Sequence, residues 1–347
     1  MRIPEYIKPG DTIAFSAPSC SCASEPARSM MHDARDVLIK RGYKVIIGKT
    51  CYLEDGKGIA TDPYDAAKEL MDFYLDDNIK AIIAAGGGEL MCETISHVDF
   101  RKLKRAKPKW FVGISDNTNM VFTLATLCNT AAIYGPVVPD FRIPLTRREE
   151  DTLGIMEGKI KKVYGYEKFA SPEKGYLHLA DHEKYHLDTP KILHNYLPVK
   201  GSMQEVHNMP INMKGMLLGG CLDVLANLCG TRFDEVKKFV RYKKIIWVLE
   251  ACDLNPMGIR RAIWELDEAG WFKNTAGFVI GRPLTARQME IMGVNQYNAV
   301  YEPLEKYGVP IIMDADIGHI NPNMPLVIGA YASVSAYNNT IEVNMEC

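Results

Sequence analysis

The feature that most constrains this 347-residue chain is a strand–turn–helix pattern at residues 108–124. Trp110–Ile114 is a short apolar run rich in aromatic and β-branched residues, which is typical of a buried strand. The next four residues, SDNT, favour turns and helix caps, and they lead into Met120–Leu127, an apolar segment long enough for a helix. The pattern therefore predicts a sharp turn over residues 113–117, directly after a buried strand.

This turn approximates a nucleophile elbow, in which a strained turn lifts a serine hydroxyl to the top of a sheet. Ser115 is then the candidate nucleophile, and the backbone amide of Asp116 is a candidate donor to an oxyanion. Asn117 replaces the second glycine of G-x-S-x-G, and we interpret it as a residue that tolerates unusual backbone angles. The alternative interpretation is that Ser115 only caps the helix.

Composition narrows the class of protein. The length favours about two domains, and a net charge of −2 gives no broad field for a nucleic acid polymer or an anionic membrane. No apolar run approaches the roughly 18 residues that span a bilayer, and the first 20 residues lack a signal-peptide pattern, so we expect a cytoplasmic protein. The nine cysteines are scattered without a CxxC pair, which predicts reduced thiols and no structural disulfide.

Strands and helices alternate through the first half of the chain. The strands are continuous apolar runs, as IKAIIA at Ile79–Ala84 illustrates, and this predicts an α/β fold with a parallel sheet covered on both faces. The other predicted elements are strands at Thr12–Ser16, Lys44–Ile47 and Ala131–Tyr134, and helices at Pro26–Gly42 and Asp62–Tyr74.

Three consecutive glycines, Gly86–Gly88, follow the strand Ile79–Ala84 and precede a predicted helix at Leu90–Ile95. Without side chains, their backbone amides can approach an anion. They are candidates for cradling a phosphate or for supplying a second oxyanion donor beside Ser115, and the alternative is a tight turn alone. Crevices in such sheets open at the carboxyl ends of the strands, where this loop and Ser115 are both expected.

The pattern changes over residues 146–198, which we interpret as a connecting segment between domains. It is rich in charged and aromatic residues with little apolar periodicity, and its rings are candidates for ligand contact or for pinning the loop. The aromatic residues are Tyr164, Tyr166, Phe169, Tyr176, Tyr185 and Tyr196. His178, His182 and His186 have helical spacing, but no carboxylate accompanies them as in H-E-x-x-H, so we favour a solvated loop over a metal site.

The second half offers two partners for a serine nucleophile. The buried strand Lys244–Leu249 ends in Glu250, and the strand Val309–Met313 runs into a Gly- and Pro-containing loop that holds His319. A serine needs a base to take its proton, and the base needs a third group to orient it, so the three residues together predict a triad between two domains. Further predicted elements are strands at Asn212–Leu218 and Ala276–Ile280, helices at Asp223–Leu228 and Gly258–Ala269, and short β segments over Pro325–Ile341.

These features together resemble the serine LD-carboxypeptidases, which include muropeptide LD-carboxypeptidases and microcin C immunity-type hydrolases. The resemblance rests on IKPGDTIAFSAPS near the start, the Gly86–Gly88 turn, GISD at 113–116, GGCL at 219–222, Glu250, and DIGH at 316–319. It implies Ser115, Glu250 and His319 as catalytic residues, Gly87 and Asp116 as oxyanion donors, and Gly88 and Cys221 as further substrate contacts. It implies no metal and no cofactor.

The resemblance also implies a domain plan. An N-terminal α/β domain at 1–145 carries the elbow, and a smaller, β-rich C-terminal α+β domain at 199–347 supplies Glu250 and His319. The family is often homodimeric. Cys221 stands where the family often has Asn, and none of the four tryptophans lies in the connecting segment, where the microcin-immunity branch tends to place one to stack on a nucleobase.

The leading functional hypothesis is a serine carboxypeptidase that acts on muropeptides through an acyl-enzyme. The alternative within the same family is a microcin immunity-type hydrolase of peptidyl- or aminoacyl-nucleotides, with a loop tyrosine stacking on the base. The alternative from another class is a non-catalytic protein that binds an anion or a peptide. The two enzymatic hypotheses call for a small peptide or a peptidyl-nucleotide as substrate.

Overall fold

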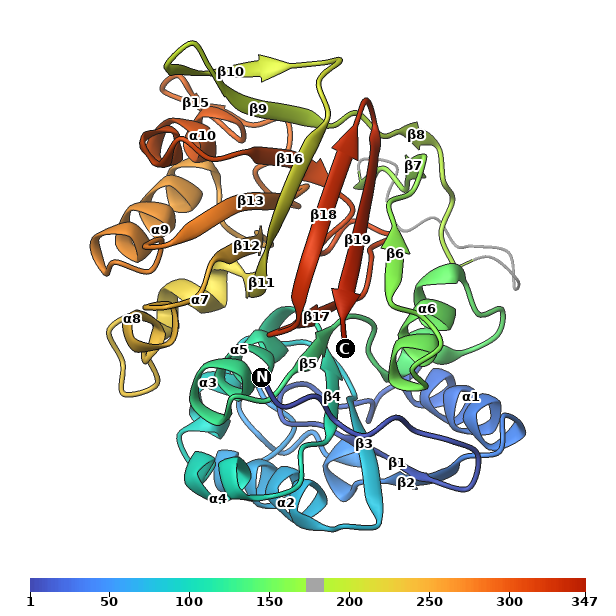
Figure 1. Cartoon of the computed structure of the whole chain (residues 1–347). Coiled ribbons are helices and arrows are strands. Elements are labelled where there is room, and N and C mark those ends of the chain that lie inside the picture. The colour runs from blue at the N-terminus through green and yellow to red at the C-terminus, as the bar shows by residue number, and fades with distance from the viewer. Residues whose placement is uncertain (173–183) are drawn as a thin grey trace. The chain divides into compact units, whose positions relative to one another are not determined.

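The computed structural model describes residues 1–172 and 184–347, and the chain divides into two compact units (Figure 1). Unit 1 comprises residues 1–161, 325–329 and 347, and unit 2 comprises residues 162–324 and 330–346. Tyr176, His178 and His182, which the sequence analysis singled out, lie outside the described residues.

Unit 1 is built on a six-stranded sheet with the order β17-β5-β4-β3-β1-β2. Strands β1 to β5 are parallel, as their continuous apolar sequences predicted, and the edge strand β17 is antiparallel. The strands are β1 Thr12–Ser16, β2 Lys44–Ile47, β3 Ile79–Ala84, β4 Trp110–Gly113, β5 Ala132–Tyr134 and β17 Leu326–Ile328. The helices are α1 Ala27–Lys40, α2 Pro63–Leu75, α3 Met91–Ile95, α4 Phe100–Arg105, α5 Thr118–Cys128 and α6 Arg147–Met156.

Unit 2 is built on a nine-stranded mixed sheet with the order β10-β9-β16-β13-β12-β11-β18-β19-β6. Its centre is parallel, and antiparallel strands continue it on both sides. The strands are β6 Lys162–Tyr164, β9 His194–Val199, β10 Ser202–Val206, β11 Ile211–Cys221, β12 Ile245–Glu250, β13 Thr275–Gly281, β16 Ile311–Ala315, β18 Tyr331–Tyr337 and β19 Thr340–Glu346.

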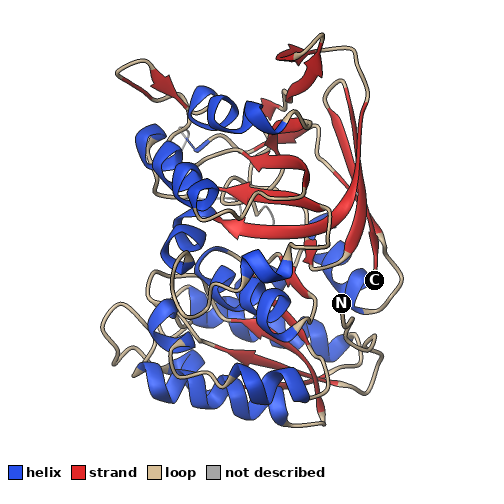
Figure 2. Cartoon of the chain, turned by 60° about the vertical axis from the view of Figure 1, so that its left-hand side comes forward, coloured by secondary structure: helices blue, strands red, loops and turns tan. Residues whose placement is uncertain are grey.

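The helices of unit 2 lie beside the parallel strands, whereas the long strands β18 and β19 carry none (Figures 1 and 2). These helices are α7 Leu222–Leu228, α8 Val236–Phe239, α9 Pro256–Glu268 and α10 Asn298–Leu304. Two short ladders complete the unit, β7 Lys168–Phe169 with β8 Thr189–Pro190 and β14 Glu290–Ile291 with β15 Val294–Asn295. The core of unit 2 is aromatic, with Trp247 stacked on Trp271 at 6.0 Å between ring centroids.

The fold class agrees with the prediction, and the differences lie at the edges. Residues 146–198, interpreted as a connection, contain α6 of unit 1 and the strands β6 to β9 of unit 2, the last of which begins at His194. The expectation of a smaller second domain is not met, because residues from this segment extend the unit 2 sheet to nine strands against six in unit 1. Edge strands tolerate polar residues on their open side, so their sequences lack the apolar signal of central strands.

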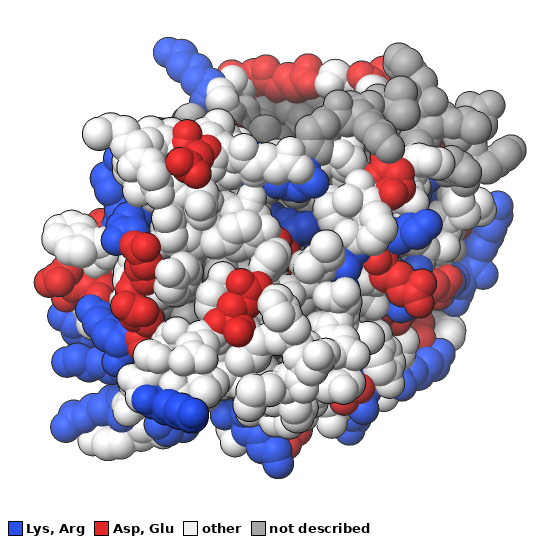
Figure 3. Space-filling model, turned by 90° about the horizontal axis from the view of Figure 1, so that it is seen from above, with Lys and Arg blue, Asp and Glu red and all other residues white. Residues whose placement is uncertain are grey.

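Charged residues of both signs are interspersed over the face shown in Figure 3, and neither sign forms a continuous field there. Over residues 1–172 and 184–347, no helix is both long and apolar enough to cross a membrane.

Candidate active site

The predicted turn at Ser115 has a strained backbone. Strand β4 ends at Gly113, helix α5 begins at Thr118, and Ser115 between them has φ +64°. Residues with a side chain seldom adopt this left-handed region, and such strain concentrates at functional sites. The amide of Ser115 donates to the Tyr134 hydroxyl at 3.1 Å, which ties the turn to the neighbouring strand β5. The backbone at Ser115 therefore has the strained strand-to-helix turn that a nucleophile elbow requires.

Asn117 does not serve the purpose that the sequence suggested. Its φ is −64°, in the ordinary helical region, so the interpretation based on unusual angles is wrong. Instead its side-chain amide donates to the carbonyls of Gly86 at 2.8 Å and Ile114 at 3.0 Å. A Cβ on Gly113 would lie 2.7 Å from the Asn117 Cβ, so a glycine is needed there to accommodate the asparagine. Asn117 thus connects the Gly86–Gly88 loop to the turn at Ser115 by hydrogen bonds.

The structure brings the glycine loop against the candidate nucleophile. A Cβ added to Gly87 would lie 3.1 Å from the Ser115 Cβ and 3.4 Å from its Oγ. The Gly87 carbonyl accepts from the Cys20 amide at 2.8 Å, and Gly88 has φ +143°, a value that favours glycine. The close approach of Gly87 to Ser115 is the geometry expected of a loop that supplies an oxyanion donor.

The side chain of Asp116 is structural. It is buried, and its Oδ2 accepts from the Ser19 hydroxyl and, at 2.8 Å, from the Met91 amide at the start of α3. Its Oδ1 accepts from the Asn119 side chain at 2.9 Å. Burial raises the pKa of this carboxyl, although the hydrogen bonds oppose the shift. The predicted oxyanion role of Asp116 therefore depends on its backbone amide alone.

In unit 2, Glu250 and His319 form a hydrogen-bonded pair. Glu250 is the last residue of β12, and its Oε2 lies 2.8 Å from the His319 Nδ1. Two glycines make room for the carboxylate. A Cβ on Gly318 would lie 2.5 Å from Oε2, and one on Gly281 would lie 2.9 Å from the Glu250 Cβ. This arrangement orients the ring and stabilises its cation, which is what a catalytic histidine needs from a carboxylate.

His319 has a second partner that the sequence analysis missed, since the Cys252 side chain also hydrogen-bonds the ring. Burial disfavours the imidazolium, but the Glu250 charge and the hydrogen bonds from Cys252 and Glu250 outweigh it and raise the pKa of His319. The Asp223 carboxylate holds the turn that carries Cys252, accepting from the amides of Cys252 at 3.1 Å, Asp253 at 2.9 Å and Leu254 at 3.2 Å. No local motif marks either residue.

Cys221, predicted to contact substrate, is buried beside this pair. It pairs with Glu250 in the β11–β12 ladder, and its thiol lies 3.4 Å from Asp223 Oδ2. Burial, reinforced by the charges of Glu250 and Asp223, raises the pKa of the Cys221 thiol well above its usual value. The thiol is therefore neutral at ordinary pH.

The structure thus groups the predicted residues into two sets. Ser115, Asp116, Gly87 and Gly88 belong to unit 1, and Glu250, His319 and Cys221 belong to unit 2. Within the described part of the chain, no group of three or more His, Cys, Asp or Glu residues is arranged to hold a metal ion.

Comparison with known proteins agrees with this division. Residues 13–135 match the model of the LD-carboxypeptidase N-terminal domain, and residues 214–334 match that of the LD-carboxypeptidase C-terminal domain. A relative from Bacillus subtilis, named as a probable murein peptide carboxypeptidase, is 22% identical over 97% of this chain and 92% of its own length. A putative carboxypeptidase of Treponema pallidum is 23% identical over 98% of this chain and 94% of its own.

Solved structures show the same fold. MccF in complex with glutamyl sulfamoyl guanosine has a TM-score of 0.78 at 19% identity, covering 99% of this chain and 98% of its own. Muramoyltetrapeptide carboxypeptidase from Oxalobacter formigenes has a TM-score of 0.66 at 21% identity, covering 97% of this chain and 99% of its own. The two family models together match more than half of the sequence, so the chain belongs to the LD-carboxypeptidase family of serine peptidases.

Proposed function

We propose that the protein is a serine carboxypeptidase in which Ser115 is the nucleophile, His319 the general base and Glu250 the residue that orients His319. The observation that carries this proposal is the left-handed backbone of Ser115 at φ +64°, in a turn between a buried strand and a helix. A serine that only capped the helix would not need this strain. The 2.8 Å contact between Glu250 and His319 supports the roles proposed for these two residues.

The reaction follows from these roles. The Ser115 Oγ attacks the carbonyl carbon of the scissile amide while His319 takes the hydroxyl proton, and the carbonyl oxygen becomes an oxyanion that backbone amides at Gly87 and Asp116 stabilise. One such donor contributes about 3 kcal/mol to the barrier reduction. His319 then passes its proton to the leaving amine, the C–N bond breaks, and an ester to Ser115 remains. Water attacks the ester with His319 as base, which releases the acid and restores Ser115.

We propose muropeptides that end in a free carboxylate as the substrate class. The names of similar curated proteins support this choice, since the Bacillus subtilis relative is named as a probable murein peptide carboxypeptidase and the Treponema pallidum relative as a putative carboxypeptidase. The competing substrate class is a nucleotide-linked amide, which the fold similarity to MccF bound to glutamyl sulfamoyl guanosine favours. The exposed Tyr164, at the end of strand β6, offers a ring for stacking on a base.

A paired hydrolysis assay read by mass spectrometry tests the proposal. Wild type, Ser115→Ala and the control Ser96→Ala each meet a muropeptide tetrapeptide ending in D-Ala and an aminoacyl sulfamoyl adenosine. Ser96 is an exposed serine whose hydroxyl donates to the Cys92 carbonyl of its own helix, so its loss leaves the elbow intact. We expect wild type and Ser96→Ala to release D-Ala, and Ser115→Ala to release none while keeping the wild-type melting temperature.

The other outcomes are equally informative. Cleavage of the adenosine compound alone would replace the substrate class and keep the triad. A folded Ser115→Ala protein that retained hydrolysis would exclude Ser115 as nucleophile. Failure of wild type on both compounds, together with no covalent labelling of Ser115 by serine-directed phosphonates, would instead favour a non-catalytic binding protein.

A further inference from the structure

A buried carboxylate three residues before His319 links the loop that carries the histidine to residues 165–170 and 188–191. Asp316 follows strand β16, and its side chain is fully buried. Its Oδ1 lies 2.6 Å from Arg282 Nη2, and its Oδ2 lies 2.8 Å from Lys191 Nζ. The same Oδ2 accepts from the Tyr166 amide at 2.7 Å. Two cations and one backbone donor therefore converge on a single carboxylate.

Two of these three partners come from one structure, which we call the stem. The stem comprises residues 165–170 and 188–191, joined by the β7–β8 ladder at Phe169 and Thr189. Its backbone is shaped for the contact, because a Cβ on Gly165 would lie 2.7 Å from Asp316 Oδ2 and 2.5 Å from Lys191 Nζ. Lys191 is itself buried, so its ammonium requires the Asp316 charge as a partner.

The stem also contacts the loop on the other side of His319. The Ala170 amide donates to the Asn321 carbonyl at 2.8 Å, two residues after the histidine. The Phe169 ring lies under the Arg282 guanidinium at 4.4 Å, the same group that binds Asp316. The stem thus holds the loop both before and after His319.

The loop transmits this restraint to the Glu250–His319 pair. Asp314 at φ +61° and Gly318 at φ +100° are left-handed residues on either side of Asp316, so the chain turns sharply there. The Met324 amide donates to the Asp316 carbonyl at 2.8 Å and closes the loop. Gly318 packs directly on Glu250, where a Cβ would lie 2.5 Å from Oε2. A shift of Asp316 therefore displaces Gly318 and changes the geometry between Glu250 and His319.

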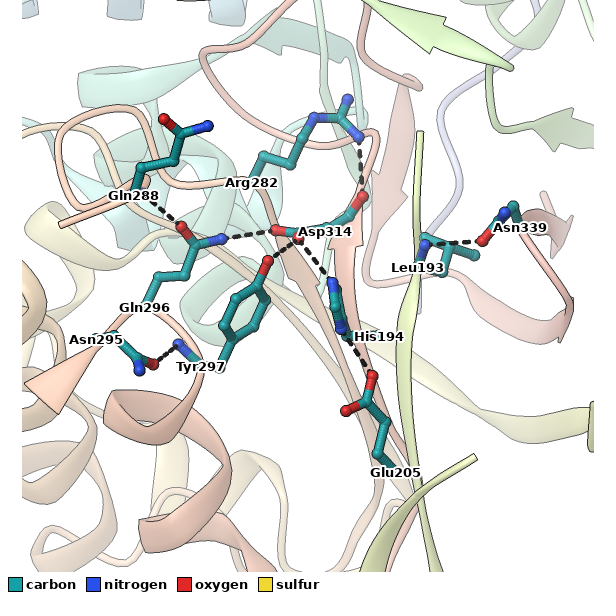
Figure 4. Close-up of polar contacts among 10 residues, drawn as sticks. All are labelled: Leu193, His194, Glu205, Arg282, Gln288, Asn295, Gln296, Tyr297, Asp314 and Asn339. Carbon is teal, nitrogen blue, oxygen red and sulfur yellow. Dashed lines mark hydrogen bonds and ion pairs between the residues drawn. The ribbon is translucent and has the colours of Figure 1, made fainter. Parts of the chain in front are cut away.

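Figure 4 shows how the start of the loop is held from the opposite side. The Asp314 carboxylate accepts from Gln296 Nε2 at 3.1 Å and from the Tyr297 hydroxyl at 2.9 Å, and His194 Nε2 lies 3.9 Å away. Arg282 Nη1 donates to the Asp314 carbonyl at 2.8 Å (Figure 4). Arg282 thus joins Asp314 to Asp316, and the stem holds the loop from the other side.

We infer that Asp316 is a positioning residue. Through it, the stem holds the His319 ring in the orientation that allows the hydrogen bond to Glu250. This inference rests on the proposed function, since it gives His319 the role of base. It assigns the stem a purpose apart from substrate contact, because a change in the stem reaches the reacting groups through one buried carboxylate.

The test uses Lys191→Met in the full chain, with Lys191→Arg as the conservative variant and Lys162→Met as the matched control. Lys191→Met leaves Arg282 and the Tyr166 amide on Asp316, so the carboxylate keeps one cation and one backbone donor. Lys162 lies three residues before the stem and pairs with Glu342 at 3.2 Å on the surface, where the charge is largely solvated.

Two measurements are made on each variant. One is the split between kcat and KM on the substrate that wild type hydrolyses. The other is the downfield proton resonance of the His319 Nδ1–H bonded to Glu250, assigned by its loss in His319→Gln, and it requires no turnover. We expect Lys191→Met to lower kcat at least tenfold with KM within twofold, and to shift or broaden the resonance. Lys191→Arg is expected to restore both, and Lys162→Met to change neither.

Each result has a defined meaning. A Lys191→Met protein with wild-type kcat and an unshifted resonance would overturn the inference. A rise in KM alone, again with an unshifted resonance, would also overturn it, since the stem would then act on substrate. If wild type cleaves none of the compounds, the proposed function fails, and the resonance alone still decides whether Asp316 positions His319.

Discussion

The Ser115 region of unit 1 and the His319 region of unit 2 are stabilised by different forces. Around Ser115, hydrogen bonds hold the strained turn, two of them from Asn117 to backbone carbonyls and others to the buried carboxylate of Asp116. Around His319, buried charges face each other, with Glu250 on His319 and Asp316 between Arg282 and Lys191. Hydrogen bonds to backbone groups hold the first region, and pairs of opposite charges hold the second.

This difference predicts that substitutions in the two regions will change stability and activity to unequal extents. A left-handed backbone outside glycine costs about 1–3 kcal/mol, and two hydrogen bonds at about 0.5–1.5 kcal/mol each offset a strain of that size. Removing one partner of a buried ion pair costs about 3–5 kcal/mol, because the other charge is left without compensation. Substitutions in unit 2 should therefore have larger effects than comparable ones at the elbow, and they should depend on pH.

The largest effect is expected from Glu250→Gln. The side chain keeps its size but loses the charge that orients His319, so kcat/KM should fall by roughly a thousandfold or more, as when a triad carboxylate is neutralised. The measurement is steady-state hydrolysis together with a thermal melt. Glu342→Gln, which neutralises a carboxylate paired with Lys162 at the surface, should stay within twofold. A similar fall in both variants would remove the contrast between a buried and an exposed charge.

A thermodynamic cycle at the elbow should show an intermediate effect. Gly113→Ala places a Cβ 2.7 Å from the Asn117 Cβ and should lower the free energy of unfolding by about 1–3 kcal/mol. Asn117→Gly removes two hydrogen bonds and should lower it by about 1–3 kcal/mol. In the double variant the clash between the Cβ added at position 113 and the Asn117 side chain is absent. The free energy of unfolding should therefore fall by less than the sum of the two single-variant losses, with a difference of about 0.5 kcal/mol or more. Additive losses in urea titrations would show that Gly113 and Asn117 do not constrain each other.

The smallest effect is expected from Cys252→Ala, and it concerns pH. His319 must be neutral to act as base, and its raised pKa places the rising limb of kcat/KM above the ordinary histidine value of about 6.5. Removing the Cys252 hydrogen bond withdraws one cause of that rise, so the limb should move to lower pH by about 0.4–1 unit. Activity at pH 7 should then increase.

The control for this prediction is Cys229→Ala, at the end of helix α7, where the thiol has other charged neighbours. Its pH profile should match wild type. A limb that moves to higher pH in Cys252→Ala would mean that the thiol opposes the charge on His319, contrary to the geometry described above.

The local sequence was informative where a segment is buried on all sides. The central strands Thr12–Ser16 and Ile79–Ala84 are observed with the predicted bounds, because strands covered on both faces need continuous apolar side chains. The partly exposed edge strand Lys44–Ile47 is also observed with the predicted bounds. Strand β9 was interpreted as part of the connecting segment, and β17 was predicted only as one of several short β segments, since their partners β16 and β5 are far away in the chain. The C-terminal β17 completes the sheet of unit 1, and no local pattern contains that information.

At the candidate site, the sequence indicated residue types, and the structure supplied their partners. Ser115, Glu250 and His319 could be selected because each follows a predicted buried strand, and chain ends of such strands expose functional groups. Cys252, Asp223 and Asp316 could not be selected in this way, because their roles depend on contacts between residues far apart in the chain. Cys252 and Asp223 are separated by 29 residues, and Asp316 and Lys191 by 125.

The sequence alone therefore determined the α/β class, the central strands, the elbow and the family, because apolar periodicity and short motifs are local properties. Only the tertiary structure showed that Asn117 is in the ordinary helical conformation and that its side chain donates to two backbone carbonyls. It also showed that His319 has two side-chain partners, and that Asp316 is bound by Arg282, Lys191 and the Tyr166 amide. A buried polar group must find its partners wherever the fold brings them, so those pairings follow from three-dimensional packing and not from spacing along the chain.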